Sequence, residues 1–146
     1  MMIKTESLSA TKDWAAKILA EIKPYEKRAT VVALAGDLGA GKTSFVQGLA
    51  AALGVIETVA SPTFVIEKIY DLLAGQKFKR LIHIDAYRLA GGAELAKLGF
   101  ADILADPANL IVIEWPERIA DILPSEAKTI HFDFIDENTR AISYGR

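Results

Sequence analysis

Residues 36–43 read Gly-Asp-Leu-Gly-Ala-Gly-Lys-Thr and match the pattern G-x-x-x-x-G-K-[ST] at every fixed position. A continuous apolar run at residues 30–35 precedes the motif, and apolar positions at helical spacing follow it from about Lys42 to Leu53. Glycines let such a segment turn tightly and direct its backbone N–H groups at phosphate oxygens, and the helix start adds the positive end of its dipole. The motif and its flanks therefore predict a phosphate-binding loop between a buried strand and a helix.

The side chains of this motif have separate expected contacts. Lys42 is expected to reach the β- and γ-phosphates of a nucleotide, and the Thr43 hydroxyl is expected to bind Mg²⁺. The sequence lacks the N-K-x-D pattern of guanine-specific proteins, which favours ATP over GTP. The expected nucleotide-binding residues are Gly36, Asp37, Leu38, Gly39, Ala40, Gly41, Lys42, Thr43 and Ser44.

Strand and helix patterns alternate along the rest of the chain. The expected helices lie at about residues 10–22, 42–53, 93–97 and 101–104, and the expected buried strands lie at 30–35, 81–85 and 109–114. Two hairpins, at about 64–85 and 128–144, add antiparallel strands. Alternation of this kind predicts an α/β fold, a P-loop NTPase-like three-layer sandwich with a mainly parallel central sheet. The length of 146 residues is typical of one domain, so residues 1–146 are expected to form a single domain.

The composition excludes several classes of function. The chain has no cysteine, which rules out disulfides, thiolate nucleophiles, iron–sulfur clusters and cysteine-ligated zinc. A net charge of -2 argues against a dedicated nucleic-acid binder, which usually has a basic surplus. The apolar runs are shorter than the ~20 residues of a membrane span, and the N-terminus has no signal-peptide pattern. We therefore expect a cytoplasmic protein with no membrane partner.

Two acidic residues follow apolar runs that resemble buried strands. Asp85 ends the run at residues 81–84, and Glu114 ends the run at 110–113. In P-loop enzymes a carboxylate at the end of a neighbouring strand helps to hold Mg²⁺. One acid is expected to hold the ion directly or through water, and the other to orient the attacking water or act as a base. Each acid is also compatible with a helix cap or a solvated strand end, and the sequence does not say which one touches the metal.

Other residues near these motifs have two interpretations each. Ser61 and Thr63 suit a switch-like loop that senses the γ-phosphate, or a plain turn. The usual burial of tryptophan favours a core position for Trp115, although it also suits the wall of a site. His83 is expected to be packed in the core rather than to bind a ligand, and Arg88 suits either a phosphate or partner contact or the solvated surface.

The loop and four further blocks, taken in order, resemble the bacterial TsaE (YjeE) family. The blocks together span about residues 9–145, and their combination is far more specific than the P-loop alone. The four blocks are Ser61-Pro62-Thr63-Phe64, His83-Ile84-Asp85-Ala86-Tyr87-Arg88-Leu89, Glu94-Leu95 with Leu98-Gly99, and Ile113-Glu114-Trp115-Pro116-Glu117.

This resemblance implies a slow, magnesium-dependent ATPase that is required for threonylcarbamoyladenosine at adenosine 37 of tRNA. ATP or ADP and Mg²⁺ are the implied cofactors, and TsaD and TsaB are the implied partners, through which tRNA is contacted indirectly. Lys42 then binds phosphate, and Thr43 and Glu114 form the magnesium pair. Asp85 is the second essential acid.

The resemblance also assigns residues outside the main motifs. Ser9 and Thr11 fall in an N-terminal segment that helps to hold the nucleotide, and Arg140 lies near a C-terminal nucleotide contact. The implied switch or partner contacts are Ser61, Thr63, Tyr87, Arg88 and Trp115.

Two other functions remain open from the residues alone. The first is a small-molecule kinase built on the same loop, although such kinases need a lid and several arginines. This chain has six arginines and no room for a lid beyond about residues 86–108. The second is a nucleotide-dependent binding module without significant turnover.

Overall fold

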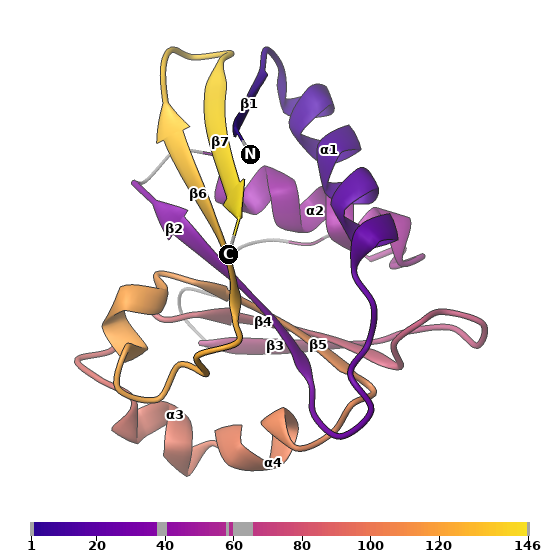
Figure 1. The fold of residues 1–146 in the computed structure, drawn as a ribbon, viewed down its shortest axis with the longest axis vertical. Coiled ribbons are helices and arrows are strands. Elements are labelled where there is room, and N and C mark those ends of the chain that lie inside the picture. Colours follow the sequence, from indigo (N-terminus) through magenta and orange to yellow (C-terminus); the bar gives the residue numbers. More distant parts are fainter. Residues whose placement is uncertain (1, 38–40, 58, 60–65, 146) are drawn as a thin grey trace.

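The computed structural model describes residues 2–37, 41–57, 59 and 66–145 of the chain. The predicted site residues Leu38, Gly39, Ala40, Ser61 and Thr63 lie outside the described residues. Figure 1 shows the elements, which in chain order are β1 (Met2–Thr5), α1 (Leu8–Glu21), β2 (Thr30–Gly36), α2 (Lys42–Ala52), β3 (Glu67–Asp71), β4 (Arg80–Asp85), α3 (Ala93–Lys97), α4 (Phe100–Leu104), β5 (Asn109–Glu114), the 3₁₀ helix η1 (Pro116–Ile119), β6 (Lys128–Phe134) and β7 (Arg140–Gly145).

The strands form one seven-stranded sheet in the order β1-β7-β6-β2-β5-β4-β3. The four central strands β6, β2, β5 and β4 run parallel to one another. The strands β3, β7 and β1 add antiparallel pairs at the two edges. The predicted α/β fold, with a parallel centre and added antiparallel strands, is confirmed.

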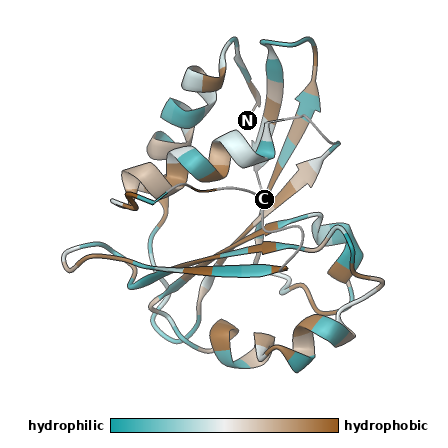
Figure 2. Cartoon of the chain, turned by 180° about the vertical axis from the view of Figure 1, so that it is seen from behind, coloured by the Kyte–Doolittle hydropathy of each residue, from teal (hydrophilic) through white to brown (hydrophobic). Residues whose placement is uncertain are grey.

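Helices cover both faces of this sheet. Helices α1 and α2 lie on one face, and α3, α4 and η1 lie on the other (Figure 1). Alternate residues of a strand point to opposite faces of the sheet. In β5, Val112 therefore lies in the core beneath α1 and α2, and Ile113 lies in the core on the α3 and α4 side. Figure 2 shows hydrophobic colouring along the central strands between the two helical layers. Strands buried on both faces explain why β2 and β5 appear as continuous apolar runs in the sequence.

Helices α1 and α2 pack closely where Gly48 faces Lys12. A Cβ atom on Gly48 would lie 2.5 Å from the Lys12 Cα and 2.6 Å from its carbonyl oxygen. These distances are shorter than any van der Waals contact, and the obstructing atoms belong to a helix backbone. The absence of a side chain at this position therefore sets the spacing between α1 and α2, the helix that follows the predicted loop.

We expect Gly48→Ala to lower the free energy of unfolding by about 1–3 kcal/mol, because the helices must move apart to admit the methyl group. Alanine is the better helix former by about 1 kcal/mol, so a net loss measures the steric contact rather than helix propensity. Urea unfolding gives the value. Gly91→Ala is the matched control, because the nearest atom to its added Cβ is Asp121 Oδ2 at 4.0 Å. Equal stability of Gly48→Ala and wild type would contradict this account of the packing.

Three local details differ from the sequence predictions. The strand β1 was not predicted, and it pairs with β7 from Met2 to Thr5. Helix α1 begins earlier than expected and is capped by Ser7, whose Oγ accepts a hydrogen bond of 3.0 Å from the Ala10 N–H. This capping role of Ser7 was likewise not predicted.

The remaining boundaries agree closely with the sequence analysis. The helix α3 was predicted with its observed bounds. After β5, Pro116 begins a 3₁₀ turn of four residues. The first strand of the hairpin expected at about residues 64–85 corresponds to β3, whose described part begins at Glu67. No described helix combines the length and the apolar character needed to cross a membrane.

Candidate functional site

The predicted loop and both acidic residues meet at the carboxyl ends of the central strands. β2 ends at Gly36, where the loop begins, and α2 follows the loop from Gly41 onward. On β5, Glu114 lies in register with Leu34 of β2 and with Asp85 of β4. The carboxyl ends of three adjacent parallel strands therefore bring these residues together, at the edge where α/β proteins bind ligands.

Gly36 meets a steric requirement at the start of the loop. Its φ is +139°, and an added Cβ would lie 2.3 Å from the Phe132 carbonyl oxygen of β6. A side chain at this position would clash with the neighbouring strand, so only glycine lets β2 turn into the loop here.

Lys42 is buried at the first turn of α2. It is 4% exposed, its Nζ donates a hydrogen bond to the Gly36 carbonyl oxygen, and it lies 3.6 Å from the centroid of the Trp115 ring. Burial lowers the pKa of the Lys42 ammonium, while nearby carboxylates, Glu114 first among them, act in the opposite direction. The site therefore holds a poorly solvated cation beside the loop, as recognition of a phosphate requires.

Glu114 is buried and paired with a histidine. It is 3% exposed, and its Oε2 lies 2.6 Å from Nε2 of His83, which is fully buried. The prediction that His83 is packed in the core is confirmed by its burial. The contact between His83 and Glu114 was not predicted, although the spacing of His83 and Asp85 on one strand indicates that their side chains share a face.

Asp85 is also buried, at 4% exposure, and its Oδ1 accepts a 3.0 Å hydrogen bond from the Tyr87 N–H. This burial rules out the alternative of a solvated strand end for Asp85, and the same holds for Glu114.

The oxygen donors at this edge suit Mg²⁺. The ion prefers hard oxygen ligands and in phosphate sites keeps several waters and only one or two carboxylates. The Thr43 hydroxyl and the carboxylates of Glu114 and Asp85 are donors of that kind. The described residues include no cluster of three or more His, Asp or Glu side chains suited to a metal.

Trp115 is partly buried: it packs against the core on the α3 and α4 side and also forms a wall of the site, so both interpretations of this residue apply. Its backbone has a φ of 60°, and its partly buried ring lies beneath Lys42. The Tyr87 ring lies 5.0 Å from that ring, and the Arg118 guanidinium lies 5.5 Å from the Tyr87 ring. We call Tyr87, Trp115 and Arg118 the aromatic patch. Arg88 is exposed beside it.

Arg140 lies against the loop from the other side. A Cβ on Gly41 would be 3.4 Å from Arg140 Cγ. The Arg140 Nη1 donates to the carbonyl oxygens of Asp136 and Thr139, and its Nε is buried with no hydrogen-bond partner among the described residues. The structure therefore places Arg140 beside the phosphate-binding segment, as the resemblance implied.

The N-terminal segment reaches this region through β1. Thr5 lies in register with Arg140, and its hydroxyl is 2.8 Å from the Thr11 hydroxyl. Thr11 is thus fully buried and engaged with Thr5, whereas Ser9 is exposed. Of the two N-terminal candidates, Thr11 is the one connected to the loop through neighbouring residues.

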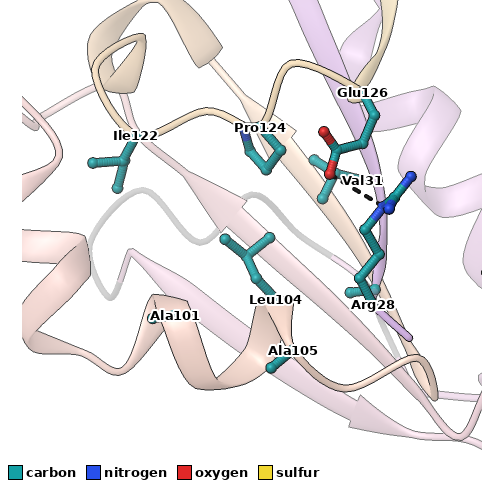
Figure 3. A pocket seen from close by; sticks show the side chains of 9 residues that line it. Arg28, Val31, Ala101, Leu104, Ala105, Ile122, Pro124 and Glu126 are labelled. Carbon is teal, nitrogen blue, oxygen red and sulfur yellow. Dashed lines mark ion pairs between the residues drawn. The ribbon is translucent and has the colours of Figure 1, made fainter.

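A separate cavity of about 440 Å³ lies near the amino end of β2, on the α3 and α4 side of the sheet. Figure 3 shows its largely apolar lining and the ion pair between Arg28 and Glu126, whose closest atoms are 3.1 Å apart. Arg28, Ala29 and Val31, at the start of β2, line this cavity, so the rest of that strand, from Val31 to Gly36, separates the cavity from the loop by about 16 Å. The cavity is therefore distinct from the candidate nucleotide site.

The sequence model of a protein family described as "Threonylcarbamoyl adenosine biosynthesis protein TsaE" matches residues 5–142. The chain belongs to the TsaE family. The resemblance found in the sequence is therefore confirmed, and TsaE membership accords with the P-loop fold and indicates nucleotide binding.

Individual relatives agree with this TsaE assignment. A protein of Borreliella burgdorferi named "tRNA threonylcarbamoyladenosine biosynthesis protein TsaE" is 42% identical over 96 residues, which cover 66% of this chain and 66% of that protein. A Rickettsia prowazekii protein of the same name is 35% identical over 138 residues, covering 94% and 89% of the two chains. The solved structure titled "Crystal structure of Bacillus subtilus YdiB" matches with a TM-score of 0.77 and 30% identity, over 99% of this chain and 83% of that one.

Proposed function

We propose that this TsaE-family chain is a magnesium-dependent ATPase, slow on its own, that acts on the TsaD–TsaB complex in threonylcarbamoyladenosine modification of tRNA adenosine 37. The observation that carries the proposal is the meeting of Lys42, Glu114 and Asp85, all at most 4% exposed, at the carboxyl edge of the sheet. A cation and two acids buried together at a P-loop suit binding and hydrolysis of a nucleoside triphosphate.

In this proposal each residue has a defined task. Lys42 exchanges the Gly36 carbonyl for the β- and γ-phosphates, which compensate its buried charge. Thr43 and Glu114 hold Mg²⁺, which neutralises the charge that develops on the phosphates. Asp85, in register with Glu114, accepts a hydrogen bond from the attacking water and orients it.

The nucleotide has further proposed contacts at the edges of the site. The backbone N–H groups at the start of α2 and of the loop bind the phosphates, and Arg140 contacts the nucleotide through its buried guanidinium. Ser9 and Thr11 assist from the N-terminal segment, where Thr11 acts through Thr5.

Partner contact is proposed for the aromatic patch and Arg88. Tyr87 is 39% exposed, and its ring lies tilted against the Trp115 ring, which also contacts the Lys42 ammonium. A partner bound there would therefore touch a residue of the nucleotide site. One domain with a net charge of -2 suits a protein that reaches tRNA through TsaD and TsaB in the cytoplasm.

The test is phosphate release from ATP, measured with and without purified TsaD and TsaB. We expect slow release alone and clear stimulation by the complex, and we expect capture of the chain by TsaD–TsaB to differ between ATP and ADP. Absence of both stimulation and capture would overturn the proposed partners. Transfer of phosphate to an added small-molecule acceptor, above the rate of hydrolysis, would favour a kinase instead.

A further inference from the structure

His83 is a polar residue in a position where an apolar one would pack. It is fully buried in β4, and it lies in register with Val112, which belongs to the core beneath α1 and α2. Its Nδ1 is buried without a hydrogen-bond partner within the described parts of the chain. An unpaired polar atom in a core costs free energy, so packing alone does not explain a histidine at this position.

Among the described residues, the imidazole ring of His83 forms a hydrogen bond between Nε2 and Glu114 Oε2 over 2.6 Å. A carboxylate has no hydrogen to give, so the ring donates and carries its hydrogen on Nε2. His83 lies two residues before Asp85 on the same strand and therefore on the same face of the sheet. It thus supports Glu114 from the interior of the sheet, on the side away from the loop.

We propose that His83 is a positioning residue for magnesium, acting through Glu114. Its hydrogen bond engages Oε2 and fixes the orientation of the carboxylate, which leaves Oε1 as the oxygen for the metal. Glu114 is thereby held in place beside Asp85, in register on the next strand, before any ion arrives. This inference rests on the proposed magnesium role of Glu114. Partners that orient metal ligands in this way typically change metal affinity by 10- to 100-fold when they are removed.

The test is calorimetric titration of Mg²⁺ into the full-length chain loaded with ADP, using three substitutions of His83. Glutamine places its amide nitrogen near the position of Nε2 and should keep the hydrogen bond. Asparagine places its amide near the position of Nδ1, and leucine has no donor. We expect His83→Gln to bind Mg²⁺ within about threefold of wild type, and His83→Asn and His83→Leu to bind it at least 10-fold more weakly.

Binding of ADP in EDTA separates positioning from structural damage. We expect all three variants to bind metal-free ADP as wild type does. Ile82→Val, a neighbouring buried substitution on the opposite face of β4, should leave both affinities unchanged. If His83→Leu fails to fold, the comparison of His83→Gln with His83→Asn still tests the positioning role. Both variants bury an amide, but only the glutamine amide reaches Glu114.

The other possible results overturn either the positioning role of His83 or the proposed function. Unchanged Mg²⁺ affinity in both His83→Leu and His83→Asn, or equal loss in His83→Gln and His83→Asn, overturns the positioning role. The same conclusion follows if metal-free ADP affinity falls as far as Mg²⁺ affinity. Failure of the wild-type chain to bind ADP with Mg²⁺ removes the proposed function itself, and the role of His83 with it.

Discussion

Lys42→Ala is expected to weaken the binding of ATP and ADP by at least about 100-fold. A hydrogen bond to a charged group is worth about 1.5–3 kcal/mol, and Lys42 is proposed to make such bonds to two phosphates. A loss of about 3 kcal/mol corresponds to slightly more than a 100-fold change in Kd. The effect is expected to be large because Lys42 is only 4% exposed, so water replaces its charge poorly. Calorimetric titration with each nucleotide measures it.

Lys17→Ala provides the matched control, because Lys17 is exposed on α1 and its loss removes the same charge elsewhere. The control should bind nucleotide normally. A thermal unfolding scan of both variants shows whether the fold persists after Lys42 no longer contacts Gly36 and Trp115. Unchanged nucleotide affinity in a folded Lys42→Ala protein would refute the phosphate role of this lysine.

The parts of the fold that were predictable from sequence are those determined by local pattern. β2 and β5 are buried on both faces, so their apolar runs are unbroken, and the helix α3 was predicted with its observed bounds. The strand β1 has only four residues, and most of their side chains are exposed or half-buried. Its strand structure comes from pairing with β7, more than 130 residues away in the chain, and no local pattern reports such a partner.

The candidate site also has a part that local sequence predicts and a part that depends on how distant strands are arranged. Strand, loop and helix are adjacent in sequence, so the P-loop motif alone predicts where Lys42 and Thr43 lie. The contact between His83 and Glu114 depends on β4 lying beside β5, and the approach of Arg140 to Gly41 depends on the position of β7. Strand order is a property of the whole sheet, so it could not be derived from these segments individually.

Trp115 shows how one backbone angle changes the interpretation of a residue. It follows a fully buried strand, and on composition a tryptophan there belongs in the core. Its positive φ ends the strand abruptly and begins η1. The ring is thereby placed beneath Lys42 while it still packs against the core on the α3 and α4 side, so one residue serves both the core and the site.

Glu114→Gln is expected to slow ATP hydrolysis by about 100- to 1,000-fold. Glutamine has nearly the same shape and keeps an oxygen that accepts the hydrogen bond from His83, so the fold should be retained. The variant lacks the negative charge that is proposed to hold Mg²⁺ at the phosphates. Removing one preorganised electrostatic contact from a buried catalytic site costs about 3–4 kcal/mol of transition-state stabilisation, which corresponds to this range of rates. Phosphate release at saturating ATP and Mg²⁺ measures the effect.

Glu117→Gln is the control for charge alone. Glu117 lies three residues further along, is exposed, and also acts on the Lys42 charge, so its loss changes the local field without removing a proposed ligand. It should hydrolyse ATP at close to the wild-type rate. Equal losses in the two variants would mean that net charge, and not a metal ligand, controls turnover.

Asp85→Asn separates the roles of the two acids, which lie in register on adjacent strands. If Glu114 binds the metal and Asp85 orients the water, Glu114→Gln lowers Mg²⁺ affinity and turnover together. Asp85→Asn should then lower turnover while Mg²⁺ affinity stays near the wild-type value, because only the nucleophile loses its partner. The reverse result, with Mg²⁺ affinity lost in Asp85→Asn and retained in Glu114→Gln, would exchange the two assignments. It would also withdraw the positioning role from His83, whose hydrogen bond reaches Glu114.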